Sequence, residues 1–122
     1  MLFRSLMANA LQAMPKGGHL SLRVYPKVVC ETDSGVGRRA TDFFKVGDTV
    51  VVCDVQDSGE GISANQIKKI FDPFFTTKCS GKGTGLGLTL VRAIIDAHRG
   101  LISVTSQEGR GTVFSIALPT VR

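Results

Sequence analysis

Residues 49–61 have the sequence TVVVCDVQDSGEG, which joins a strongly apolar segment to a glycine-rich turn. Valine occurs at both alternating positions between Thr49 and Gln56, a pattern typical of a central strand that is covered on both faces. Asp57 follows at the end of this strand, where its carboxylate can accept a hydrogen bond from an exocyclic amine such as that of adenine. Gly59 and Gly61 allow the backbone to approach a flat ring closely. By itself D-x-G-x-G is also a common turn, so both interpretations stay open here.

The segments on either side of this strand predict the rest of the fold. The expected elements are a helix over 1–14, a strand over 19–25, a hairpin connection or mobile insertion over 26–48, the strand over 49–56, a short helix from Ser63 to about Phe71, a loop over 74–83, a helix over 85–99 and strands over 101–106 and 112–118. This order predicts an α+β protein, a two-layer α/β sandwich with a mixed sheet and helices packed on one face. We expect one domain over 1–122. Its first helix has no capping residue, which suggests a fragment of a longer chain.

A second group of glycines lies where the 85–99 helix begins, in the sequence GKGTGLGL at 81–88. Closely spaced glycines leave backbone N–H groups free to face phosphate oxygens, and the helix dipole favours an anion at this end. Lys78 and Lys82 add positive charge beside it. The sequence matches neither G-x-x-x-x-G-K-[ST] nor G-x-G-x-x-G, so the common phosphate and dinucleotide loops are excluded. A glycine-rich turn without a ligand is the alternative.

The first helix carries a polar stripe opposite its apolar positions, formed by Ser5, Asn9, Gln12 and Lys16. The amide oxygen of Asn9 is a hard ligand that suits Mg²⁺ shared with phosphates. An asparagine on a helix face is usually only solvated. Its order in the chain, ahead of the aspartate turn and the glycine-rich helix start, favours a nucleotide site.

Composition narrows the classes of protein further. The chain has 122 residues, 43% of them hydrophobic, and a formal net charge of +5, which indicates a globular domain with anionic partners. No apolar stretch is long enough for a membrane helix. The three cysteines, Cys30, Cys53 and Cys79, form no C-x-x-C pair and indicate reduced thiols in a cytosolic setting. Tryptophan is absent, which argues against a platform for stacking nucleic-acid bases.

Five motifs in this order resemble the ATP-binding domain of sensor histidine kinases, closest to the nitrogen-regulation type. They are Asn9-Ala10 with the turn at 14–18, which is similar to the N box; 57–62, similar to the G1 box; 70–75, similar to the F box; 83–88, similar to the G2 box; and the G-R-G-T-x-F sequence at 109–114, similar to the final Gly-Thr motif. The similarity spans almost the whole chain.

The resemblance implies a Bergerat-type fold that binds ATP and Mg²⁺ in the cytoplasm, whether or not the parent protein is anchored in a membrane. It implies that Asn9 coordinates Mg²⁺ and that Asp57 holds the adenine amine. The implied ATP-binding residues are Asn9, Gln12, Asp57, Gly59, Gly61, Ile62, Lys78, Lys82, Gly83, Thr84, Gly85, Leu86, Gly87, Leu88 and Thr112. Lys78 and Lys82 fall in the ATP lid of the family, and Thr112 in the strand behind the adenine. The implied partners are a dimerisation and phosphoacceptor domain and, indirectly, a response regulator.

Two departures from the family pattern have consequences. Ser5 stands where the family usually has a second asparagine, and we expect weaker metal or phosphate coordination there. Neither His19 nor His98 lies in a helical hairpin, so the phosphoacceptor histidine is expected outside this chain. Two alternatives remain: a serine protein kinase of the anti-sigma-factor type on the same fold, and a basic module that binds nucleic acid through Arg38 and Arg39.

Overall fold

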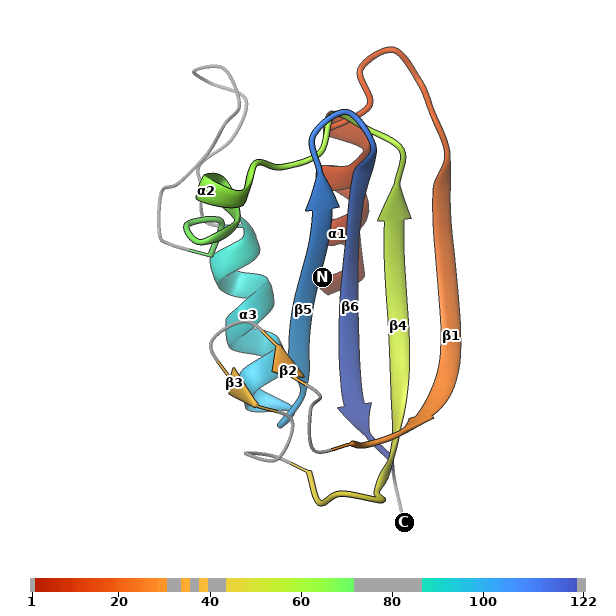
Figure 1. Cartoon of the computed structure of the whole chain (residues 1–122), viewed down its shortest axis with the longest axis vertical. Helices are drawn as coiled ribbons and strands as arrows, with labels where there is room; N and C mark the ends of the chain where they lie inside the picture. The colour runs from red at the N-terminus through yellow and green to blue at the C-terminus, as the bar shows by residue number, and fades with distance from the viewer. Residues whose placement is uncertain (1, 31–33, 36–37, 40–43, 72–86, 121–122) are drawn as a thin grey trace.

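The computed structural model describes residues 2–30, 34–35, 38–39, 44–71 and 87–120, and Figure 1 shows their arrangement. The helices are α1 (Leu2–Gln12), α2 (Ala64–Ile67) and α3 (Gly87–Ala97), and the strands are β1 (Leu20–Val28), β2 (Ser34–Gly35), β3 (Arg38–Arg39), β4 (Thr49–Asp57), β5 (Leu101–Gln107) and β6 (Gly111–Pro119). β1 continues to Val28, so this strand occupies the first part of the range expected as a connection. None of the described helices has the length and apolarity that a membrane crossing requires.

The main sheet has four strands in the order β1-β4-β6-β5. The predicted α+β sandwich is confirmed, but the prediction of a mixed sheet is wrong for the described strands, because every pair in this sheet is antiparallel. β4 and β5 do point the same way, as Figure 1 shows, and the helical connection between them led to the prediction. They are not neighbours, because β6 lies between them and pairs with both.

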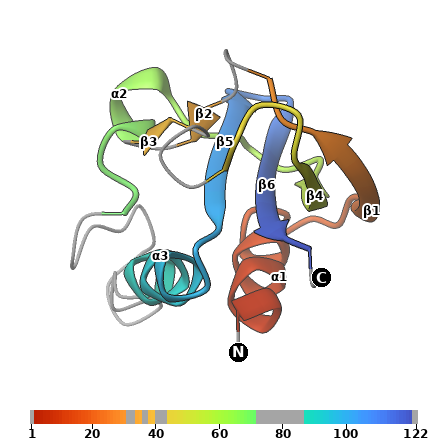
Figure 2. The ribbon, with the colours of Figure 1, turned by 90° about the horizontal axis from the view of Figure 1, so that it is seen from below.

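Both longer helices, α1 and α3, cover one face of this sheet (Figure 2). The main core lies between the two layers and contains Leu6, Val55, Ile70, Phe71, Val91, Ile95, Ile102, Phe114 and Ile116. Leu6, Ile95 and Ile116 have no exposed surface, and burying a side chain of this size stabilises the fold by roughly 1.5–3 kcal/mol. The helical periodicity of α1 and α3 therefore reflects real burial against the strands.

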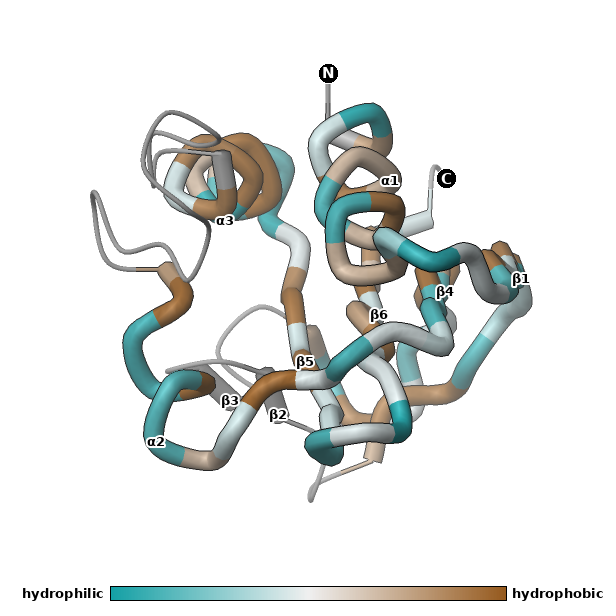
Figure 3. The backbone as a smooth tube through the Cα atoms, turned by 90° about the horizontal axis from the view of Figure 1, so that it is seen from above, coloured by the Kyte–Doolittle hydropathy of each residue, from teal (hydrophilic) through white to brown (hydrophobic). Residues whose placement is uncertain are grey.

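The helix layer leaves most of β1 uncovered. Side chains alternate between the two faces of a strand, so Leu20, Leu22 and Val24 share one face of β1, and Leu20 packs against the main core. Leu22 and Val24 are nevertheless 57% and 70% exposed, since α1 does not extend over them. Figure 3 shows the hydrophobic residues of β1 at the edge of the sheet, beside α1. The apolar face of β1 is therefore only partly buried.

The opposite face of the sheet carries a second, smaller cluster with a polar border. Val29, Phe44, Val50, Val52 and Leu101 form its buried part. Beside them Asp54 accepts hydrogen bonds from the Tyr25 hydroxyl (3.0 Å) and the Ser115 hydroxyl (2.6 Å). A cavity of about 150 Å³ lies on this face, and none of the residues that line it belongs to the predicted nucleotide site.

We expect the phenol of Tyr25 to ionise above its ordinary pKa, because burial and the hydrogen bond to Asp54 both favour the neutral form. A pKa that folding raises contributes to the stability of the folded state. This contribution is present in full below the pKa of the unfolded chain, near 10, and it is lost as the pH rises through the pKa of the folded protein. Tyr25 is the only tyrosine, so phenolate absorbance reports this group alone. Asp54→Asn should lower its pKa towards the ordinary value. An identical titration curve in that variant would contradict the role of Asp54.

Candidate nucleotide-binding site

Four residues form one row across the sheet, at the end where β4 finishes. Leu20 pairs with Asp57, Asp57 with Thr112, and Thr112 with Ser106. Asp57 and Thr112 lie on the helix-covered face, because each is two residues from a member of the main core. They are 5% and 4% exposed, and they are the buried polar residues among those that the structure describes. The structure thus brings together two of the predicted binding residues, from segments far apart in the sequence.

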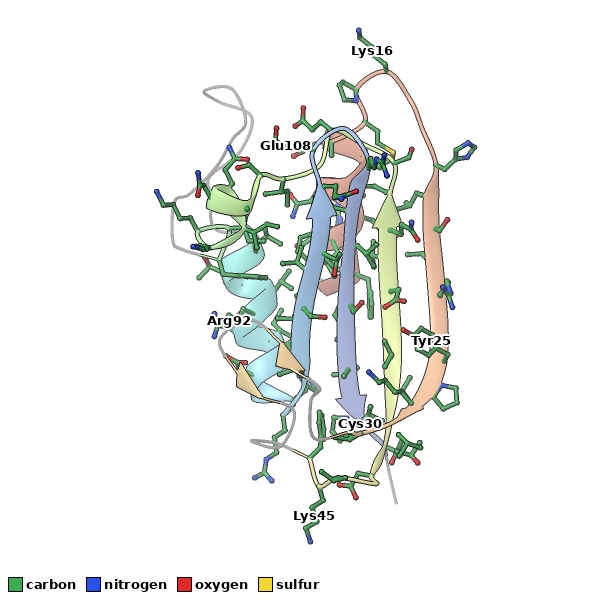
Figure 4. The ribbon with its side chains drawn as sticks, viewed as in Figure 1. Lys16, Tyr25, Cys30, Lys45, Arg92 and Glu108 are labelled. Atoms are coloured by element: carbon green, nitrogen blue, oxygen red, sulfur yellow. The ribbon has the colours of Figure 1, made fainter. Side chains whose placement is uncertain are left out.

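Backbone turns surround this end of the sheet. The turn after α1, which carries Lys16, and the β5–β6 turn, which carries Glu108, lie there together in Figure 4, while Tyr25 lies towards the other end. The Asp57 carboxylate stabilises the turn after β4, because its Oδ1 accepts a hydrogen bond from the N–H of Gly59 at 2.9 Å. An aspartate that binds its own backbone two residues on is a common way to end a strand in a turn. Its second oxygen, Oδ2, has no hydrogen bond among those resolved between described residues.

Packing inside the protein also requires glycine at positions 59 and 61. A Cβ on Gly59 would collide with the carbonyl oxygen of Ala13 at the end of α1. Gly61 has φ 75°, and a Cβ there would collide with the carbonyl oxygen of Gln107. Both glycines therefore let the turn pack tightly between α1 and the β5–β6 turn. Their predicted contact with a flat ring stays a prediction.

The same packing determines where Asn9 lies. The N–H of Glu60 donates to the carbonyl of Ala13 (3.2 Å), and the Ala13 Cβ lies 2.9 Å from the position of a Cβ on Gly59. Asn9 is one helical turn earlier, and residues four apart share a helix face. Its half-buried side chain is therefore on the face of α1 that meets the Asp57 turn. Gln12 is exposed at the last residue of α1.

Ser106 is a site residue that the motif analysis missed. Its hydroxyl oxygen accepts the N–H of Ile62 at 2.7 Å and lies 2.9 Å from the carbonyl oxygen of Gly111 and 2.8 Å from the hydroxyl of Thr112. Ile62, predicted as a binding residue, is thus tied to the row, and it also packs against the main core. The sequence did hold a signal, because Ser106 continues the inward-facing positions of Ile102 and Val104 with a polar residue.

The predicted phosphate contacts fall mostly outside the described residues. This applies to Lys78, Lys82, Gly83, Thr84, Gly85 and Leu86. Gly87 is the first residue of α3, and the Leu88 side chain packs against the main core. The backbone N–H groups of this first turn have no partner within the helix, so they are the groups that a phosphate could contact here. Thr89 in the same turn donates its hydroxyl to the carbonyl of Phe71 (3.0 Å). This bond joins α3 to the residue that follows Ile70.

Comparisons with known proteins find similar sequences and a similar fold. The family model described as "Histidine kinase-, DNA gyrase B-, and HSP90-like ATPase" matches residues 1–122. Sensor kinase CckA of Brucella abortus is 43% identical over 115 residues, which cover 94% of this chain and 12% of that protein. Sensor histidine kinase ZraS of Escherichia coli is 41% identical over 115 residues, covering 94% of this chain and 20% of that protein. The chain thus spans at most about a fifth of these relatives.

A solved structure of the mycobacterial sensor histidine kinase MprB is similar in fold. It superposes with a TM-score of 0.69 at 24% identity, over 97% of this chain and 67% of that one. At this identity the likeness concerns the fold alone. The four-stranded sheet covered by helices on one face is thus an arrangement that a known kinase shares.

Proposed function

Because the chain belongs to the family of histidine kinase-, DNA gyrase B- and HSP90-like ATPases, we propose that it is the ATP-binding catalytic domain of a two-component sensor histidine kinase. In this proposal it binds Mg·ATP and transfers the γ-phosphoryl group to a histidine on a separate dimerisation domain. A response regulator is then the later acceptor, and the domain works in the cytoplasm, where ATP is available.

The observation that carries the proposal is the pair Asp57 and Thr112, which are buried side by side at the end of an otherwise apolar sheet face. Oδ1 of Asp57 accepts the N–H of Gly59, and Oδ2 has no hydrogen bond to another described residue. Since no described side-chain oxygen is both buried and without a partner, Oδ2 is accessible to a ligand. An exocyclic amine on a flat, apolar ring supplies a donor to the other oxygen and apolar surface to the core. Adenine has this chemistry.

We assign phosphate binding to residues 78–86 and to the start of α3. Phosphoryl transfer depends mainly on positioning and on neutralising phosphate charge, for which helix N-termini and lysines are suited. The start of α3 and the predicted contacts of Lys78, Lys82 and residues 83–86 fill this role. Thr89, in the first turn of α3, donates its hydroxyl to the carbonyl of Phe71.

Asn9 fits the metal role that the family implies. Its amide oxygen is a hard ligand, and α1 holds it on the face that meets the Asp57 turn. Among the described residues no three His, Cys, Asp or Glu side chains cluster, so a site there would combine Asn9 with nucleotide phosphates rather than a protein cage. Mg²⁺ bound there would neutralise phosphate charge, and Ser5, one turn earlier, offers a hydroxyl oxygen, which like the Asn9 amide oxygen is neutral.

Thermal unfolding tests the proposed function. A ligand that binds only the folded state at a hundred times its dissociation constant stabilises it by about 2.7 kcal/mol. Mg·ATP should therefore raise the melting temperature by several degrees, and a double-stranded DNA oligonucleotide should leave it unchanged. Stabilisation by DNA but not by Mg·ATP would support the nucleic-acid alternative. The curated relatives named above are sensor kinases, which favours a histidine over a serine acceptor.

Asn9→Ala should weaken ATP binding in Mg²⁺ by about tenfold and hardly at all in EDTA, because only the metal-bound complex uses its oxygen. Isothermal titration in the two buffers measures the difference. Asn65→Ala is the matched control, since Asn65 is an exposed asparagine on α2 to which no binding role is assigned. Equal losses with and without metal would show that Asn9 only supports the helix.

A further inference from the structure

From the hydrogen bonds around Ser106 we infer that this residue sets base specificity. It selects a 6-amino over a 6-oxo purine because it holds the hydroxyl hydrogen of Thr112 in one direction. This inference rests on the proposed nucleotide site. It concerns a residue that touches no predicted ligand atom itself and acts through its neighbour. Ser106 is therefore a positioning residue.

The proton of each hydroxyl follows from counting donors and acceptors. A serine hydroxyl has one hydrogen and two lone pairs. The N–H of Ile62 occupies one lone pair of Ser106 (2.7 Å), and the carbonyl of Gly111 can only accept, so it takes the single hydrogen (2.9 Å). The contact with the Thr112 hydroxyl, 2.8 Å long, must then be a donation from Thr112 to Ser106. This is the one arrangement in which all three bonds are made at once.

Because the Thr112 hydroxyl donates its hydrogen to Ser106, it can only accept a hydrogen bond from a ligand. Asp57, its direct neighbour on β4, is an ionised acceptor as well, and one of its oxygens already holds Gly59. The side chains of Asp57 and Thr112 therefore present acceptors and no donor to a bound base. Directly opposed residues of an antiparallel pair have Cβ atoms about 5 Å apart.

A primary amine on an aromatic ring matches this pair. Its two hydrogens point about 120° apart, so two acceptors at ordinary hydrogen-bond length lie about 5 Å from each other. A 6-oxo group has no hydrogen and would set its own lone pairs against both Asp57 and Thr112. Fixing the Thr112 proton on Ser106 thus adds a second penalty against a 6-oxo purine to the one that Asp57 imposes.

The test compares ATP and ITP, which share sugar and phosphates and differ at ring positions 6 and 1. Isothermal titration gives the ratio of their affinities for the intact chain and for Ser106→Ala. Without Ser106 the Thr112 hydroxyl is free to donate to a 6-oxo group, so the ATP-to-ITP ratio should fall by about three- to tenfold. Ser106→Thr keeps the hydroxyl and should keep the ratio. Ser103→Ala makes the same change on the same strand, but on the other sheet face, and should leave the ratio unaltered.

The ratio separates specificity from support of the fold. Loss of the Ile62 bond alone would weaken ATP and ITP equally and leave the ratio as it is, and that result would overturn the inference while leaving the proposed function intact. If the unaltered chain bound neither nucleotide, the proposed function would fail with it. Thr112→Val supplies a second variant: it should also lower the ratio, and adding Ser106→Ala to it should change the ratio no further. A further fall in the double variant would show that Ser106 does not act through Thr112.

Discussion

Asp57→Asn is expected to lower the affinity for ATP by about ten- to a hundredfold, the equivalent of one hydrogen bond to a charged group. The structure explains why so small a change has such an effect. One carboxylate oxygen is already used by the N–H of Gly59 at 2.9 Å, so a ligand amine depends on the other. An asparagine has one oxygen for the two donors, and in either orientation its NH₂ group faces an N–H.

Isothermal titration with Mg·ATP measures the change, and Asp54→Asn provides the control. Asp54 lies on the same strand, but it faces the opposite side of the sheet, where it binds Tyr25 and Ser115. That variant should bind ATP as tightly as the unaltered chain. Undiminished affinity in Asp57→Asn would remove Asp57 from the base site.

The second large effect concerns phosphoryl transfer. We expect the chain alone to bind Mg·ATP without labelling itself from γ-labelled ATP, and to label a separate helical hairpin that carries a phosphoacceptor histidine. Transfer requires an imidazole in line with the γ-phosphate at near-attack distance. His19 precedes β1, and His98 follows α3, where its Nδ1 lies 2.8 Å from the carbonyl of Ile94. Neither is part of a helical hairpin that could move it to the nucleotide.

Acid-labile, alkali-stable phosphate is the signature to measure, because phosphohistidine has this stability. A hairpin in which the histidine is replaced by glutamine controls for other acceptors. Acid-labile label on His19 or His98 would show that the chain contains its own acceptor. Acid-stable label on an added serine-bearing substrate would favour a serine kinase on the same fold.

Much of the secondary structure was predictable because its signals are local. The valine-rich strand ends at Asp57, as the aspartate-glycine pattern indicated. The capping box of Ser63 and Gln66 forms at the predicted helix start, with both of its hydrogen bonds present. That helix, however, ends at Ile67 rather than near Phe71. Such features depend on residues within a few positions of each other, so a single sequence contains them.

Pairing between segments that are far apart in the sequence was harder to predict from the sequence. A helical connection between two strands suggested parallel neighbours, and nothing local revealed that β6 would lie between β4 and β5. In the same way the apolar face of β1 was evident from alternation, but its exposure depends on how far α1 extends over the sheet. Both outcomes depend on strand order and helix placement, which are properties of the assembled layers.

Residue type and short-range geometry were enough to predict the chemical groups of the candidate site: a carboxylate at a strand end, glycines where the chain turns, and an amide on the first helix. These features can be read without knowledge of the fold. Which of these groups face one another depends on the assembled layers. Ser106 and Ile62 are 44 residues apart, and the strand register alone places Ser106 opposite Thr112 and Thr112 opposite Asp57. A shift of one residue in that register would turn these side chains to the other face, because neighbouring residues of a strand point in opposite directions.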